Sequence, residues 1–249
     1  MEASPQPIPL QPSLLALAGY LVLQVLINLV LSAVLRRRGM KPGELLVSTF
    51  WASVANAVYF LVAAILLHIN GYAPNRDEPR SDYLLLALLG IPLGPLLWYL
   101  AVMGRKLGNA LFGRSGLVAA EDAILSVPPQ PRYIGWGVIN LAVIQPLGRE
   151  TFFRGALLPT IGISFGWPMA ITATLVIELL LRLNISWFFQ VAVYVLCVSG
   201  LYIVTGTALT GLVAASVAGL LQAVVLLRVA GRARDAQAET ILGGNGTAD

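Results

Sequence analysis

The sequence predicts an all-α fold: a polytopic transmembrane helical bundle of about seven helices. The chain has 249 residues, of which 57% are hydrophobic and 11% are charged, a balance typical of neither a soluble nor a disordered domain. Apolar stretches near the ~20 residues needed to cross a bilayer recur along it. Lysines and arginines also gather between alternate stretches, as expected for cytoplasmic loops.

Seven apolar stretches are expected to form membrane spans within a single membrane domain, residues 1–249. In chain order they cover residues 14–35, 45–69, 83–103, 133–158, 168–183, 187–204 and 208–229. Residues 1–13 are a polar, proline-rich segment without the basic start of a signal peptide, so the first stretch is expected to stay as a helix. Pro92 and Pro95 predict a kink in the third span, because proline removes a helix hydrogen bond. Residues 235–249 are polar and predict a flexible tail.

The charge of the loops predicts the orientation. With the N-terminus outside and the C-terminus cytoplasmic, twelve lysines and arginines lie inside and only Arg76 and Arg80 lie outside. The net charge of +4 indicates attraction to membrane lipids and not to nucleic acid, because the basic residues flank the spans. A compact chain without a sorting signal favours a prokaryotic plasma membrane.

Charged residues also occur inside two of the apolar stretches. Arg149, Glu150 and Arg154 lie in the fourth, and Glu178 and Arg182 lie in the fifth. An unpaired charge at the centre of a membrane costs ~3 kcal/mol, so these groups must face the interior of the bundle and pair. Four-residue spacing pairs Glu150 with Arg154 and Glu178 with Arg182 on the same helix face. Arg149 is left over, and we expect it to reach across to Glu178.

Two segments resemble motifs of a known family. Residues 149–158, Arg-Glu-Thr-Phe-Phe-Arg-Gly-Ala-Leu-Leu, resemble the first signature of the CPBP family, also called Abi or CAAX-protease-like intramembrane endopeptidases, in which two adjacent glutamates precede xxxR-G-x-L-L. Residues 200–207 are similar to the Thr-Gly-Ser/Thr segment before the family's last catalytic helix. The resemblance implies a CPBP-like core at 133–229 and hydrolysis of peptide bonds by water that a glutamate activates. Its catalytic residues would then be Glu150 and Arg154.

The departures from the family pattern favour a degenerate member. Arg149 stands where the family has the first glutamate, and arginine cannot act as a base. The positions of the two histidine motifs fall on Ile177, Leu181, Ala215 and Gly219, so both histidines are absent. The single histidine, His68, lies at the outer end of the second span and is expected to be an interfacial anchor. No metal or other cofactor is expected, because a metal site needs three or more ligands.

The last span carries small residues where the family has a catalytic histidine. Gly211, Ala215 and Gly219 recur at every fourth position. Small residues at this spacing let two helices approach closely. We therefore expect this face to serve helix packing.

Three functions stay open. The first is a catalytically degenerate homologue that acts as a scaffold, a regulator or a binder of a membrane or prenylated peptide. The second is an active, divergent endopeptidase in which Glu150 activates water, with an oxyanion donor from Arg154, Arg149 or Asn140. The third is a small transporter or lipid-handling protein with Gln145, Arg149, Glu178 and Gln190 along its pathway.

Overall fold

A computed structural model describes residues 11–38, 42–71, 82–113, 131–182 and 185–244. Over these residues the chain forms helices and no strand, and the helical segments join into seven rods, as predicted. In chain order the segments are α1 (Gln11–Arg38), α2 (Pro42–Ile69), α3 (Tyr83–Leu88), α4 (Gly90–Phe112), α6 (Pro131–Ile139), the π-helical turn η1 (Asn140–Ile144), α7 (Gln145–Phe152), the π-helical turn η2 (Phe153–Leu157), α8 (Leu158–Phe165), α9 (Trp167–Arg182), the 3₁₀ turn η3 (Ile185–Trp187), α10 (Phe188–Thr205) and α11 (Ala208–Gly244).

Four of the rods are long and apolar enough to cross a membrane. Within the described residues these stretches are Leu46–Ile69, Leu84–Phe112, Phe188–Thr205 and Ala208–Arg232. The stretches Gln11–Leu23 and Trp167–Leu181 are apolar but shorter. The rod from α6 to α8 has the length, but it carries four charged residues and two π-helical turns. Length and composition therefore mark four of the seven expected spans.

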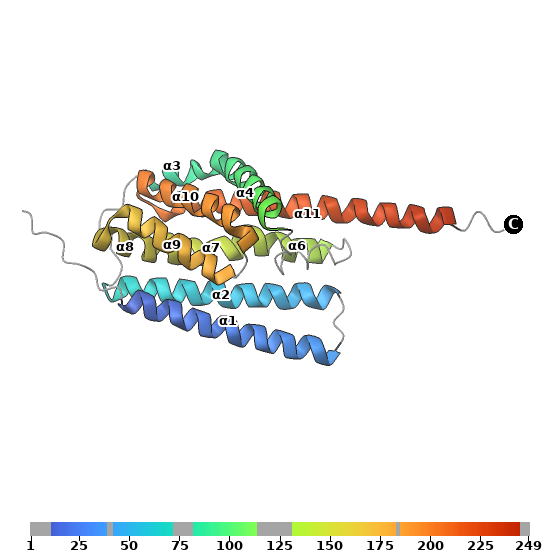
Figure 1. Cartoon of the computed structure of the whole chain (residues 1–249), viewed down its shortest axis with the longest axis horizontal. Coiled ribbons are helices and arrows are strands. Elements are labelled where there is room, and N and C mark those ends of the chain that lie inside the picture. Colours follow the sequence, from blue (N-terminus) through green and yellow to red (C-terminus); the bar gives the residue numbers. More distant parts are fainter. Residues whose placement is uncertain (1–10, 39–41, 72–81, 114–130, 183–184, 245–249) are drawn as a thin grey trace, which may run out of the picture.

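The rod from α6 to α8 lies in the middle of the bundle. Figure 1 shows α1 and α2 along one edge, α3, α4 and α10 towards the opposite edge, and α11 reaching past the other helices. The α7 segment contacts both α2 and α11, while α8 contacts α9. Arg149, Glu150 and Arg154 of this rod thus lie among other helices, as the cost of a charge in an apolar environment requires.

The third rod breaks between α3 and α4, at Leu89. Pro92 cannot donate a backbone hydrogen bond, and its ring clashes with the carbonyl group four residues earlier, which belongs to Leu88. The break therefore lies one turn before the proline. Pro95 stays inside α4, and α4 runs past the expected end of the span to Phe112.

Buried glycines let α4 approach its neighbours closely. Gly90, Gly94, Gly104 and Gly108 are all buried. A Cβ atom at Gly108 would lie 2.0 Å from the carbonyl oxygen of Ser186, and one at Gly90 would lie 2.6 Å from that of Thr210. These glycines therefore allow α4 to pack backbone to backbone against η3 and α11.

The small-residue stripe of α11 has the expected packing role. A Cβ atom at Gly219 would lie 2.0 Å from the carbonyl oxygen of Leu141, and one at Gly211 would lie 2.6 Å from Cγ1 of Val198. Ala215, between the two glycines, is 4% exposed. The stripe brings α11 against η1 and α10.

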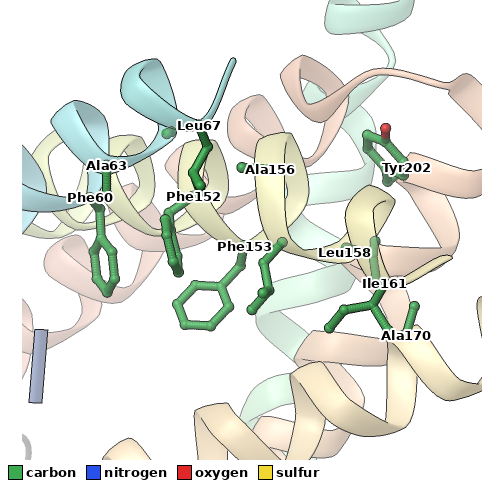
Figure 2. Packing of buried hydrophobic residues seen from close by; sticks show 12 residues of the cluster. Phe60, Ala63, Leu67, Phe152, Phe153, Ala156, Leu158, Ile161, Ala170 and Tyr202 are labelled. Atoms are coloured by element: carbon green, nitrogen blue, oxygen red, sulfur yellow. The ribbon is translucent and has the colours of Figure 1, made fainter. Parts of the chain in front are cut away.

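An aromatic cluster joins α2 to the central rod. The ring of Phe60 stacks on that of Phe152 with centroids 4.9 Å apart and meets that of Phe153 edge-on at 5.6 Å. Figure 2 shows these rings, with Tyr202 at the far side of the same cluster. Ile177 and other partly buried residues of α9 pack against it. The cluster fills the space beside the buried charges with apolar surface.

The last helix is longer than expected. It continues to Gly244, so residues 235–244, expected to belong to a flexible tail, are helical. Half of the residues in this stretch are alanine, glutamine, glutamate or leucine, which are strong helix formers. The N-terminal residues 1–10 and the last residues 245–249 lie outside the described part of the chain.

Candidate functional site

Two π-helical turns flank the segment that carries the buried charges. The turn η1 precedes α7 and the turn η2 follows it. Each turn is followed by a helix with proline at its second position, Pro146 in α7 and Pro159 in α8. Because proline cannot donate to the carbonyl group four residues earlier, the preceding turn widens. Turns of this kind are rare and often occur at functional sites. The two prolines thus place two such turns next to the charged residues of α7 and η2.

Five side chains form a closed ring, which we call the charge network. It consists of Arg149, Glu150, Arg154, Glu178 and Tyr194. The hydroxyl group of Tyr194 donates to Oε1 of Glu150 at 2.5 Å. Nε of Arg154 lies 3.5 Å from Oε2 of Glu150, and Nη1 of Arg154 donates to Oε1 of Glu178. Arg149 donates to the other oxygen of Glu178. The guanidinium carbon of Arg149 lies 4.0 Å from the centre of the Tyr194 ring, and this contact completes the ring of five side chains.

Burial differs among the members of the charge network. The side chains of Glu150 and Arg154 are 0% exposed and that of Glu178 is 2% exposed, whereas that of Arg149 is 20% exposed. Two carboxylates and two guanidinium groups balance one another, so the network is neutral overall. Buried charges persist in proteins only when they are paired and hydrogen-bonded in this way.

Two of the three expected pairs are present. The contact of Arg149 with Glu178 and that of Arg154 with Glu150 both occur. Both oxygens of Glu178 bind arginines of the neighbouring rod, while the third expected pair, Glu178 with Arg182, rests on a side chain outside the described residues. The backbone of Arg182 ends α9, and its side chain lies outside the described residues.

Tyr194 is the member of the network that the sequence analysis missed. It lies in the middle of α10, a helix that reads as an apolar span. One signal was available: Gln190 precedes it by four residues, so two polar groups share one face of that helix. An apolar span with a polar face predicts a buried polar partner.

A cavity of about 210 Å³ lies beside the network, and we call it the Arg149 cavity. Residues of α4, η1, α7, η3, α10 and α11 line it. Its polar lining residues are Trp98, Gln145, Arg149, Trp187, Gln190, Tyr194 and Gln222. Nε1 of Trp98 donates to Oε1 of Gln222 across it, at 2.9 Å. Glu150 is not among its lining residues, whereas Ala215 and Gly219 are.

A second cavity, of about 280 Å³, lies at the end of α2 and is almost wholly apolar. His68, Thr151 and Gly155 are among the residues that line it. Nδ1 of His68 lies 2.8 Å from the carbonyl oxygen of Ala64 in its own helix. The histidine therefore contacts neither Glu150 nor the rest of the charge network in any described interaction.

Several buried polar atoms near the network lack a hydrogen-bond partner among the described residues. They are Oδ1 of Asn140, Oε2 of Glu150, Nε and Nη2 of Arg154, and Oε1 of Gln190. Asn140, a possible oxyanion donor, lines neither of the two cavities. Within the described residues no three His, Cys, Asp or Glu side chains come together as metal ligands could.

No family model matches this sequence, and comparisons with curated proteins and with solved structures find no match.

Proposed function

We propose that the chain is an integral membrane protein, similar to CPBP proteins in its central helices, that binds a ligand between its helices and does not hydrolyse peptides. The membrane location is supported by four long apolar helices and by the predicted bias of basic residues to one side. The neutral charge network between three rods supports it further, because paired charges are what an apolar environment tolerates.

The state of Glu150 is the observation that carries the proposal. A general base must reach the water molecule whose proton it takes, within about 2.6–3.2 Å. Glu150 is 0% exposed, lines neither cavity, and already accepts a hydrogen bond from Tyr194 and pairs with Arg154. These contacts favour a carboxylate that holds helices together over one that activates water.

The positions of the family histidines support the same interpretation. Ile177 and Leu181 pack against the aromatic cluster, where a polar ligand would have no partner. Ala215 and Gly219 line the Arg149 cavity, where they leave space in place of a catalytic side chain. A cavity lined at two of the four histidine-motif positions, with no histidine there, supports a chain that binds a ligand and does not hydrolyse peptides.

The direct test is peptide cleavage in liposomes. Purified wild-type protein and the Glu150→Gln variant are reconstituted with single-span and prenylated peptides, and products are read by mass spectrometry. We expect no cleavage that depends on Glu150. Products made by wild type and lost in a helical, monodisperse Glu150→Gln variant would overturn the proposal. Because that variant could fail to fold, Glu150→Asp, which keeps the carboxylate but shortens it, is measured in parallel.

The membrane orientation has its own test. Reporter domains fused after Gly71 and after Gly113 are expected on opposite sides, with the latter in the cytoplasm together with the C-terminus. A reporter pattern with both sites on the same side would contradict the predicted topology.

A transporter or lipid-handling protein is the second candidate. The observation that favours it is that Gln145, Arg149 and Gln190, three of the four residues suggested for a pathway, line one cavity. The fourth, Glu178, binds Arg149. Uptake of labelled lipids or solutes into proteoliposomes distinguishes this candidate from a static binder.

A further inference from the structure

The electrostatic character of the Arg149 cavity indicates which ligands it can take. Among the described residues that line it, Arg149 is the one that carries a formal charge, and no carboxylate faces the space. Glu178, which balances this charge, is 2% exposed and does not line the cavity. A molecule in the cavity therefore meets a cation first, and an anionic oxygen group is favoured over a cationic one.

Arg149 keeps the capacity to bind such a group. A guanidinium group has five N–H donors, and its contact with Glu178 engages Nη2. The side chain is 20% exposed and lines the cavity, and its guanidinium carbon lies 4.0 Å from the centre of the Tyr194 ring. The guanidinium group is thus fixed by two partners and still has donors for a third.

The remaining polar groups suit an oxygen-rich headgroup. The amides of Gln145 and Gln190 line the cavity, and Oε1 of Gln190 is buried without a hydrogen-bond partner in the described part of the chain. An unsatisfied buried acceptor needs a donor such as a hydroxyl group. A glycerol or protonated phosphate hydroxyl group supplies it.

The size and walls of the cavity indicate an amphipathic ligand. Leu97, Val102, Leu141 and Val191 contribute apolar surface. Its volume of about 210 Å³ is below the ~300–1,000 Å³ typical of sites that hold a whole drug-sized ligand. The cavity therefore has room for a headgroup with a few methylene groups, but not for complete acyl chains.

A second cation lies near the cavity. The guanidinium carbon of Arg105 in α4 lies 5.0 Å from the ring of Trp187, and Trp187 lines the cavity. In the predicted topology this end of α4 faces the cytoplasm, where basic residues attract anionic lipid headgroups. The charge thus favours approach of an anion from that side.

We propose that the Arg149 cavity binds the phosphate or carboxylate group of an amphipathic molecule, with Arg149 as its cationic ligand and the amides of Gln145 and Gln190 as further polar contacts. This inference rests on the proposed function, since it presupposes a chain that lies in a membrane and binds a ligand there.

The test measures retention of phosphatidylglycerol by native mass spectrometry, with the full chain in phosphatidylcholine nanodiscs that contain a minor share of phosphatidylglycerol. We expect wild type to retain phosphatidylglycerol at least tenfold over phosphatidylcholine. Arg149→Gln, which removes the cation, and Ala101→Leu, which fills the cavity from α4 without touching the charge network, should each reduce this preference about tenfold. Ala101→Leu keeps the test valid if Arg149→Gln fails to fold.

Each variant has a matched control outside the cavity. Arg228→Gln removes an exposed cation of α11, and Ala110→Leu adds the same volume on the exposed side of α4. Both should leave the lipid preference unchanged. Equal preference in all five proteins, or equal losses in the controls, would overturn the inference, since attraction to the protein surface would then explain the retention.

A competition arm identifies the source of the anionic group. Octanoate or inorganic phosphate that displaces phosphatidylglycerol only from proteins with an intact cavity would support the shared chemistry and show that a soluble molecule can supply it. No displacement, with the Arg149 and Ala101 effects intact, would support a lipid as the source. If the lipid test fails and no Glu150-dependent cleavage is found, this inference alone is refuted. If Glu150-dependent cleavage is found, the proposed function is refuted.

Discussion

Replacement of Glu178 by glutamine is the sharpest perturbation of the charge network. Glu178→Gln keeps the shape of the side chain, so the packing changes little, but the network goes from neutral to a charge of +1. Both oxygens of Glu178 bind arginines, and its side chain is 2% exposed. Removing one partner of a buried ion pair costs about 3–5 kcal/mol. This is a large part of the about 5–15 kcal/mol by which folded domains are stable.

The burial of the two arginines decides where in the range of about 3–5 kcal/mol the loss falls. Arg149 is 20% exposed and can turn towards the cavity, so the loss of Glu178 destabilises it less than it destabilises Arg154. Arg154 is 0% exposed and keeps only the Glu150 carboxylate, 3.5 Å from its Nε atom. We therefore expect a loss of about 3 kcal/mol in the free energy of unfolding, at the lower end of the range for broken buried pairs. The double variant Arg149→Gln/Glu178→Gln is neutral again and should be at least about 1 kcal/mol more stable than Glu178→Gln alone.

Steric trapping in bicelles measures the unfolding free energy of both single variants, the double variant and wild type. Arg228→Gln serves as the control, because it removes an exposed charge of α11 and should leave the free energy nearly unchanged. A loss below about 1 kcal/mol for Glu178→Gln, or a double variant whose loss equals the sum of the single losses, would refute the argument that these charges stabilise one another.

Two further variants test separate contacts. Tyr194→Phe removes the hydroxyl group that donates to Glu150, and the lost hydrogen bond to a charged group should lower the free energy of unfolding by about 1.5–3 kcal/mol in the same assay. Gly219→Ala places a Cβ atom 2.0 Å from the carbonyl oxygen of Leu141, so α11 must shift. The free energy of unfolding should fall by about 1–3 kcal/mol. Gly231→Ala in the same helix meets nothing within 4 Å and should be neutral or slightly stabilising; similar losses for both alanine variants would contradict the packing argument.

Much of the fold was predictable because its signals are local. The apolar stretches gave the seven rods, and the proline at position 92 gave a break near the right place. Within the site, the cost of a buried charge predicted the contact of Arg149 with Glu178 and the pairing of Glu150 with Arg154. Four-residue spacing proposes partners within one helix and cannot weigh them against partners on another, so it did not indicate that both oxygens of Glu178 bind arginines of the neighbouring rod.

The sequence by itself determined the helical class, the number of rods and the need for Arg149, Glu150, Arg154 and Glu178 to meet partners inside the bundle. These follow from local hydropathy and from the cost of an unpaired charge, which depend on residue type alone. The tertiary structure alone decided that Tyr194 completes the network, that Glu150 is sealed from both cavities, and that Arg149 is the network's exposed cation. Such facts depend on which faces of three separate rods meet, and that choice is made by close packing of small residues over the whole bundle.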